Sequence, residues 1–258
     1  MSRLQDHIAL ITGASRGIGR AVAQAYVREG ARVALVATGQ ARLDALVREM
    51  GWSPDQALCI AADVSSQADA QRAVEQTIGQ WGRVDVLVNN AGIYHAAPFL
   101  EHKPQDFQRL LDVNLFGVMH FMQACLPQMQ QRRSGAIVNI ASTAGKWGSR
   151  NQSAYNTSKH AVVGLTRCVA LEASAHQVTV NAICPGFVQT DMVDELKAQA
   201  SQAAGTSVED FLKAMMGRVP LGRFMQPEEI AELAVFLGSP AARGITGQSI
   251  HIDGGMVL

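Results

Sequence analysis

The chain has 258 residues, of which 48% are hydrophobic and 17% charged, and its formal net charge is zero. Such a composition can bury a large core and excludes a disordered chain. Lysine and arginine are scattered rather than clustered, so we expect neither a nucleic-acid partner nor attraction to an anionic membrane.

The four cysteines form no CxxC pair and no cluster with histidine at metal-ligand spacing. We therefore expect reduced core thiols and no metal. The first apolar run, at residues 8–11, is too short for a signal peptide or a membrane span. A cytoplasmic protein is expected.

Strand-like and helix-like segments alternate along the chain. Apolar runs predict strands at 7–12, 31–37, 56–64, 84–92, 135–142, 177–186 and 247–255. Amphipathic segments predict helices at 18–30, 41–51, 66–82, 105–131, 153–175, 191–219 (irregular, with a capping box at 206–209) and 226–239, where Pro227 lies in the first turn. Repeated β-α-β units predict one domain over residues 1–258, an α/β doubly wound parallel sheet of the Rossmann type with helices on both faces.

A glycine-rich turn, TGASRGIG at 12–19, separates the first strand from the first helix. In doubly wound sheets this turn binds a dinucleotide pyrophosphate at the helix N-terminus. The spacing G-x3-G-x-G differs from the commoner G-x-G-x-x-G, and a purely structural turn is the alternative interpretation.

A tyrosine and a lysine four positions apart, Tyr155 and Lys159, occupy one face of the helix predicted at 153–175. Alone, such a pair is typical of a solvated helix surface. A neighbouring ammonium would favour phenolate and lower the phenol's pKa towards the working range of an acid–base catalyst.

Five segments together are similar to the short-chain dehydrogenase/reductase family. They are TGASRGIG, NNAG at 89–92, Ser142, Tyr155-x3-Lys159 and PGFVQT at 185–190, and the match is collinear over essentially the whole chain. The resemblance implies hydride transfer between a nicotinamide and a ketone or secondary alcohol. It gives Tyr155 the role of general acid or base, and makes Lys159 its tuner and the holder of the nicotinamide ribose. Ser142 would orient the carbonyl oxygen, and Asn114 would link a water to the lysine.

The resemblance also implies the cofactor contacts. They are expected at Gly13, Ser15, Arg16, Gly17, Ile18, Gly19, Thr38, Asp63, Val64, Asn90, Ala91, Gly92, Tyr155, Lys159, Pro185, Gly186, Val188 and Thr190. Thr38 stands where NAD-dependent relatives carry an acidic residue, and Arg16 can pair with a 2′-phosphate. NADP(H) is therefore preferred and NAD(H) possible, while a merely solvated Arg16 is the alternative.

The segments expected to contact the substrate resemble those of two subfamilies. AGIYHAAP at 91–98 is similar to 3-hydroxybutyrate dehydrogenases, but Tyr94, Ala144, Gln152 and Leu196 include no cation to hold a carboxylate. TAGKWG at 143–148 resembles the aromatic-polyketide ketoreductases. This resemblance implies that Trp147 lines the site of an apolar substrate. The segment 191–219 matches the family's substrate lid. Its apolar residues, Met192, Leu196, Phe211, Leu212, Met215 and Met216, form either a substrate wall or the buried face of two helices.

The sequence thus predicts an NADP(H)-dependent ketoreductase acting on a 3-oxoacyl thioester or a related apolar ketone. The alternatives are an NAD-dependent alcohol or 3-hydroxyacid dehydrogenase working oxidatively, and a non-catalytic cofactor-sensing scaffold. The resemblance implies a homotetramer built on 105–131, 153–175 and the last strand. Arg132 and Arg133 either guide an anionic carrier or form a solvated helix end.

Overall fold

The seven strands in the part of the chain that the structure describes belong to one parallel sheet with the order β3-β2-β1-β4-β5-β6-β7. The computed structural model describes residues 2–257, with their side chains except those of residues 191–196 and 200. The strands are β1 (Ile8–Thr12), β2 (Arg32–Ala37), β3 (Ala57–Ala61), β4 (Val86–Asn89), β5 (Gly135–Ile140), β6 (Val178–Pro185) and β7 (Ser249–Ile252). The order reverses between β1 and β4, where Ile11 pairs with Leu35 on one side and Val88 on the other. The predicted doubly wound fold is confirmed.

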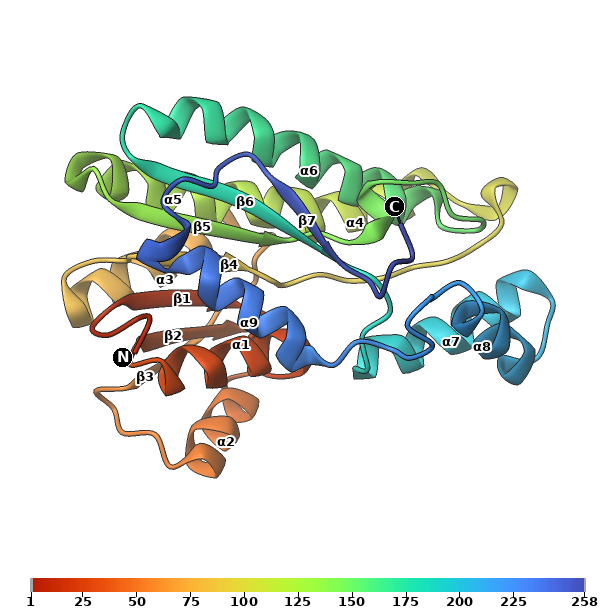
Figure 1. The fold of residues 1–258 in the computed structure, drawn as a ribbon, viewed down its shortest axis with the longest axis horizontal. Helices are drawn as coiled ribbons and strands as arrows, with labels where there is room; N and C mark the ends of the chain where they lie inside the picture. Colours follow the sequence, from red (N-terminus) through yellow and green to blue (C-terminus); the bar gives the residue numbers. More distant parts are fainter. Residues whose placement is uncertain (1, 258) are drawn as a thin grey trace.

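Helices cover both faces of this sheet (Figure 1). They are α1 (Gly17–Arg28), α2 (Gln40–Met50), α3 (Gln67–Trp81), α4 (Pro104–Leu111), α5 (Gly117–Arg132), α6 (Ser153–Ser174), α7 (Asp191–Ala204), α8 (Val208–Met216) and α9 (Pro227–Gly238). The short helices are η1 (Phe99–Glu101), η2 (Asp112–Phe116), η3 (Thr143–Gly145) and η4 (Pro240–Ala242). One core layer joins α1, α2 and α9 to the sheet, and the other joins α3, α5 and α6. The central strands are continuous apolar runs because they are buried on both sides.

The helix predicted at 105–131 is interrupted by a π-helical turn, η2, between α4 and α5. The whole run Pro104–Arg132 is long and apolar enough to cross a membrane by length and composition alone. In this structure α5 packs against one face of the sheet, because its residues Phe121, Met122 and Cys125 lie in the core layer shared with α3 and α6.

The capping box predicted at 206–209 is wrong by one residue. Ser207 is the N-cap of α8, and its hydroxyl accepts a hydrogen bond from the Asp210 N–H at 3.0 Å. Thr206 instead helps to end α7, because its N–H donates to the Ser201 carbonyl at 3.0 Å after the left-handed Gly205. Asp210 brings a favourable negative charge to the first turn of α8.

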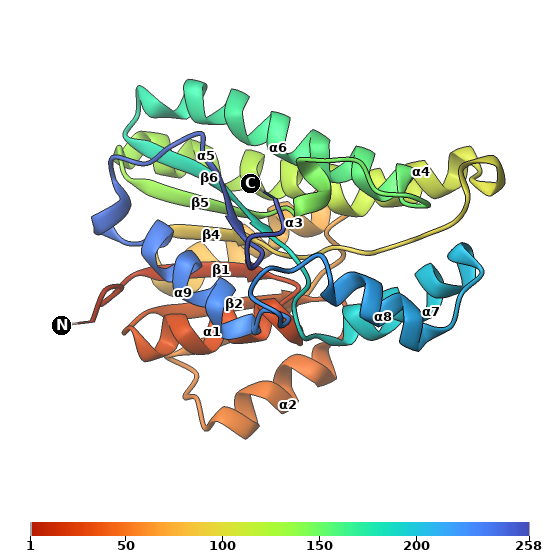
Figure 2. The same cartoon turned by 45° about the vertical axis from the view of Figure 1, so that its right-hand side comes forward.

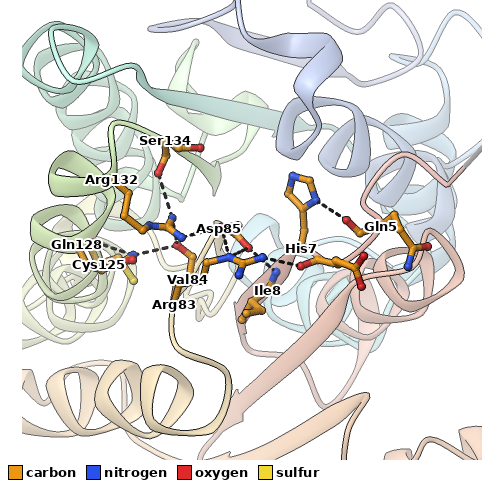
Figure 3. Close-up of polar contacts among 11 residues, drawn as sticks. Gln5, His7, Ile8, Arg83, Val84, Asp85, Cys125, Gln128, Arg132 and Ser134 are labelled. Atoms are coloured by element: carbon orange, nitrogen blue, oxygen red, sulfur yellow. Dashed lines mark hydrogen bonds and ion pairs between the residues drawn. The ribbon is translucent and has the colours of Figure 1, made fainter.

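Arg132 is part of a structural network at the amino ends of β4 and β5 (Figure 3). Its guanidinium pairs with Asp85 at 2.9 Å and donates to the carbonyls of Val84 and Ser134. Asp85 also accepts from the Ile8 N–H, which ties β1 to the same point. This end of a parallel sheet lies opposite the ligand-binding end, so the network argues against a carrier-guiding role for Arg132.

The segment predicted as a lid forms α7 and α8. Both views place these helices beyond the carboxyl ends of the strands, away from the two helical layers (Figure 2). Gln199 of α7 accepts a hydrogen bond from the Ala96 N–H at 3.3 Å, and the Ala203 carbonyl accepts from Asn151 at 3.0 Å. The two helices therefore contact the loops that follow β4 and β5.

Candidate active site

A cleft of about 1070 Å³ opens at the carboxyl ends of the strands. Nearly all candidate residues line it. Gly19 and Asn114 do not and lie behind its wall, while the side chains of Met192 and Leu196 are outside the described residues. Residues from six separate segments thus meet at the end of the sheet where doubly wound folds bind ligands.

The glycine turn forms the floor of one half of the cleft. Gly17 has φ +53°, a conformation that favours glycine, and it begins α1 with its backbone towards the opening. A Cβ on Gly19 would lie 2.2 Å from the Gly13 carbonyl oxygen, so α1 approaches β1 more closely than any side chain permits. The exposed backbone and the start of α1 fit a pyrophosphate.

Asn90 holds the glycine turn through side-chain hydrogen bonds. Its amide donates to the carbonyls of Thr12 and Gly13 at 3.0 and 3.1 Å, while the Thr12 hydroxyl accepts from the N–H groups of Asn90 and Ala91 at 3.0 Å. These bonds link the ends of β1 and β4. Asn90 therefore holds the turn in shape, and Ala91 and Gly92 leave open space above β4.

The far end of this half is lined by Thr38, Arg16, Arg42 and Asp63. Thr38 is exposed, and no acidic side chain stands at the end of β2. Arg42, in the first turn of α2, was missed by the sequence analysis because only the fold brings it beside the glycine turn. An end with two guanidinium groups suits an anionic group on the ribose.

Tyr155, Lys159 and Ser142 line one wall of the cleft. The Lys159 ammonium lies 5.8 Å from the centre of the Tyr155 ring and donates to the Ile140 carbonyl at 3.1 Å. Ser142 caps η3, where its hydroxyl accepts from the Ala144 N–H at 3.1 Å. Helix α6 and the end of β5 thus present a phenol, a hydroxyl and a buried ammonium to one side of the cleft.

Burial dominates the protonation of this group. It raises the pKa of the Tyr155 phenol to about 12, opposed by a hydrogen bond with Ser142. It also lowers the pKa of the Lys159 ammonium to about 8. The rise follows because loss of water disfavours the phenolate more than the Ser142 hydrogen bond favours it. That Lys159 tunes the phenol stays a prediction. At neutral pH the phenol keeps its proton and can donate it.

Asn114 lies in the π-turn η2 and is fully buried. Its side-chain oxygen accepts from the Ile93 N–H at 2.8 Å, and its amide donates to the Ile93 carbonyl and the Ser158 hydroxyl, each at 3.0 Å. Asn114 and Lys159 both flank Gly92. The widened turn brings Asn114 to the loop after β4, and π-turns of this kind are frequent at functional sites.

The other half of the cleft is lined by Tyr94, Ala144, Gln152 and Trp147. The Tyr94 ring contacts the Tyr155 ring edge-on, with centroids 5.0 Å apart. The Arg218 guanidinium lies 4.0 Å from the centre of a Trp147 ring. Aromatic surface and a stacked cation therefore form this wall.

Two of the four described apolar residues of the predicted lid line the cleft. Phe211 and Met215 line the cleft, whereas Leu212 and Met216 do not. Arg109, Arg150 and Arg218 also line the cleft, and the sequence analysis named none of them. They come from α4, the loop before α6 and the end of α8. No motif connects them, and only the fold places them on one cleft.

The comparisons with known proteins agree with this fold and cleft. Residues 13–257 match the family model described as enoyl-(acyl carrier protein) reductase. A 3-oxoacyl-[acyl-carrier-protein] reductase FabG from Thermotoga maritima is 38% identical over 256 residues, 99% of this chain and all of the relative. The corresponding reductase of Synechocystis is 38% identical over 260 residues and the full length of both chains. A crystal structure of a short-chain type dehydrogenase/reductase from Mycobacterium marinum superposes with a TM-score of 0.90 at 36% identity, covering 98% of this chain and 96% of that one.

The fold and the cleft define a nicotinamide-dependent oxidoreductase built on a Rossmann-type sheet. The chain belongs to the short-chain dehydrogenase/reductase family.

Proposed function

We propose that this enzyme is an NADP(H)-dependent ketoreductase that reduces the 3-oxo group of an acyl thioester. The observation that carries the proposal is one cleft in which Ser142, Tyr155 and Lys159 face the space beside the glycine turn. The names of the relatives, which are 3-oxoacyl-[acyl-carrier-protein] reductases, support the same substrate class.

The cofactor's hydride, when NADPH is bound, supplies the two electrons that reduce the carbonyl carbon. Ser142 holds the carbonyl oxygen, and Tyr155 gives that oxygen its phenolic proton as the carbon–oxygen double bond becomes single. The resulting phenolate is stabilised by the Lys159 ammonium and regains a proton from solvent. Asn114, behind Gly92, connects this group to the loop after β4. A non-catalytic scaffold would not need all four groups together.

The preference for NADP(H) rests on the adenosine end of the cleft. Arg16 and Arg42 line it, and no carboxylate at the end of β2 repels a 2′-phosphate. We expect Arg42→Ala to raise the KM for NADPH at least about 10-fold while changing the KM for NADH little, since bidentate phosphate contacts are strong. Equal effects on the two cofactors would contradict the preference.

The arginines at the substrate end suit an anionic substrate. Arg218 is fixed over Trp147, and Arg150 lines the same rim. A coenzyme A or carrier-protein thioester carries phosphate beyond its acyl chain, and a free 3-oxoacid carries a carboxylate. The second candidate function, a 3-hydroxyacid dehydrogenase, is favoured by the same cations.

A rate panel tests these proposals. We expect NADPH with acetoacetyl-coenzyme A to exceed both NADPH with acetoacetate and NADH with the thioester in kcat/KM. Faster reaction with acetoacetate, or with 3-hydroxybutyrate and NAD, would favour the second candidate. No activity of the wild type towards any ketone or secondary alcohol would favour a non-catalytic cofactor-sensing scaffold.

We also propose a homotetramer assembled through α5, α6 and the edge strand β7. Leu171 of α6 is 79% exposed, and β7 ends the sheet with one open edge. Light scattering should give four chains for the wild type and fewer for Leu171→Lys. A monomeric wild type would overturn this assembly.

A further inference from the structure

We propose that His95, His102 and Asp106 form a site for a divalent transition-metal ion, of which Zn²⁺ is the probe, beside the catalytic cleft. Among the residues that the structure describes, these three are the one group of histidine, cysteine and acidic side chains whose ligand atoms all lie within 4.8 Å of one another. The sequence analysis missed them because His95-x6-His102-x3-Asp106 matches no metal motif.

The local fold brings the three side chains together. His95 lies in the loop after β4, His102 ends η1, and Asp106 is in the first turn of α4. The His95 Nε2 atom lies 3.8 Å from Asp106 Oδ1, and the His102 Nδ1 atom lies 3.7 Å from Asp106 Oδ2. The two imidazole rings meet edge-on with centroids 5.4 Å apart.

The environment of the His102 ring is a second observation, separate from the distances, that indicates a bound ligand. The His102 side chain is only 1% exposed, yet neither ring nitrogen has a hydrogen-bond partner within the described part of the chain. A buried imidazole with two unpaired nitrogens loses its hydration without compensation. A metal–nitrogen bond would satisfy the nitrogen that faces Asp106.

The donor set fits a transition metal. Neutral imidazoles and a carboxylate are typical ligands of Zn²⁺, and three protein ligands leave one position for water. A hydrogen bond from the Lys103 N–H at 2.8 Å orients the Asp106 carboxylate. Tetrahedral bonds of about 2.1 Å place ligand atoms about 3.4 Å apart. The three ligand atoms lie within 4.8 Å of one another, so binding would draw them closer together, and the partly exposed His95 ring can rotate to contribute.

The site would fix the loop that carries Tyr94, the residue next to His95. That loop leads from the cleft to α4. At its start the Tyr94 ring contacts Tyr155, and beyond it Arg109 of α4 also lines the cleft. The ion would act as a clamp on the cleft wall and take no part in hydride transfer.

Titration of the chelator-treated enzyme with Zn²⁺ against a chromophoric indicator tests the proposal. We expect one ion per chain in the wild type, and a Kd raised at least about 10-fold in each of His95→Ala, His102→Ala and Asp106→Asn. At saturating Zn²⁺ the wild type should gain about 5 °C in Tm, and the three variants should gain less than half of this. Bound Co²⁺ should give the visible absorption of a tetrahedral site.

The matched controls are His176→Ala and Cys168→Ser. His176 follows the C-terminal end of α6, and Cys168 is an exposed thiol on that helix. Both should bind Zn²⁺ as the wild type does. If His102→Ala does not fold, His95→Ala and Asp106→Asn decide the outcome. Wild-type affinity in the cluster variants, or no stoichiometric binding by the wild type, would overturn the proposal.

Discussion

The Tyr94 ring packs edge-on against the Tyr155 ring, with 68° between their planes. This contact joins the loop after β4 to the face of α6 that carries Tyr155, and both rings line the cleft. The position of the proposed proton donor therefore depends on an aromatic neighbour from another segment.

Removing the Tyr94 ring should impair catalysis more than removing its hydroxyl. We expect Tyr94→Phe to keep kcat within about 3-fold of the wild type, because the edge-on contact, typically ~1 kcal/mol, is retained. Tyr94→Ala leaves Tyr155 unsupported and should lower kcat at least about 10-fold. Steady-state assays of both variants check this, and equal losses would show that the hydroxyl, not the ring, matters.

Two glycines provide a matched test of the turn. Gly19→Ala should abolish cofactor binding or folding, because the new Cβ would overlap the Gly13 carbonyl oxygen. Gly79→Ala lies in α3 in open space and should stabilise the protein by roughly 0.5–1 kcal/mol. Cofactor titration and urea unfolding measure the two effects. Normal cofactor binding by Gly19→Ala would disprove the close packing.

Ketone reduction should slow as pH rises through about 8. Burial lowers the Lys159 pKa to about 8, whereas the Tyr155 pKa stays near 12. The active form, a neutral phenol beside an ammonium, therefore predominates below about pH 8. A profile of kcat/KM from pH 6 to 10 should be flat and then fall. A flat profile to pH 10 would contradict the assigned role of the lysine.

The buried ammonium should also cost stability. Folding lowers the pKa of Lys159 from 10.5 to about 8, so between these values the folded chain binds fewer protons than the unfolded chain, and stability rises with pH. Lys159→Met removes the buried charge and should raise the free energy of unfolding at pH 7 by up to roughly 3 kcal/mol. The gain should shrink towards pH 10.5, and urea unfolding at both pH values measures it. A variant less stable than the wild type at pH 7 would show that the bond to Ile140 outweighs the burial.

The strands and most helices were predictable because their patterns are local. Apolar runs identify buried parallel strands, and the glycine turn identifies the first βα connection. The π-turn at Asn114 was not predictable, because it depends on bonds from Asn114 to Ile93, which lies in another segment. The apolar period of the helix continues through it unchanged.

The collinear motifs predicted residues that the structure brings together on one wall of the cleft, but not the charges around them. Arg42, Arg109, Arg150 and Arg218 come from four segments without a shared motif, and tertiary folding alone places them on the cleft. The rise in the pKa of Tyr155 was also not predictable, because the sequence does not show the depth of burial.

Tyr155→Phe is the most direct test of the account, because it removes the proton donor and keeps the ring. The measurement is kcat for 3-oxoacyl thioester reduction, made beside cofactor binding by nicotinamide fluorescence. We predict a kcat at least about 100-fold below wild type, with the Kd for NADPH changed less than about 3-fold. Turnover within a few-fold of wild type would contradict the assignment of Tyr155 as the acid.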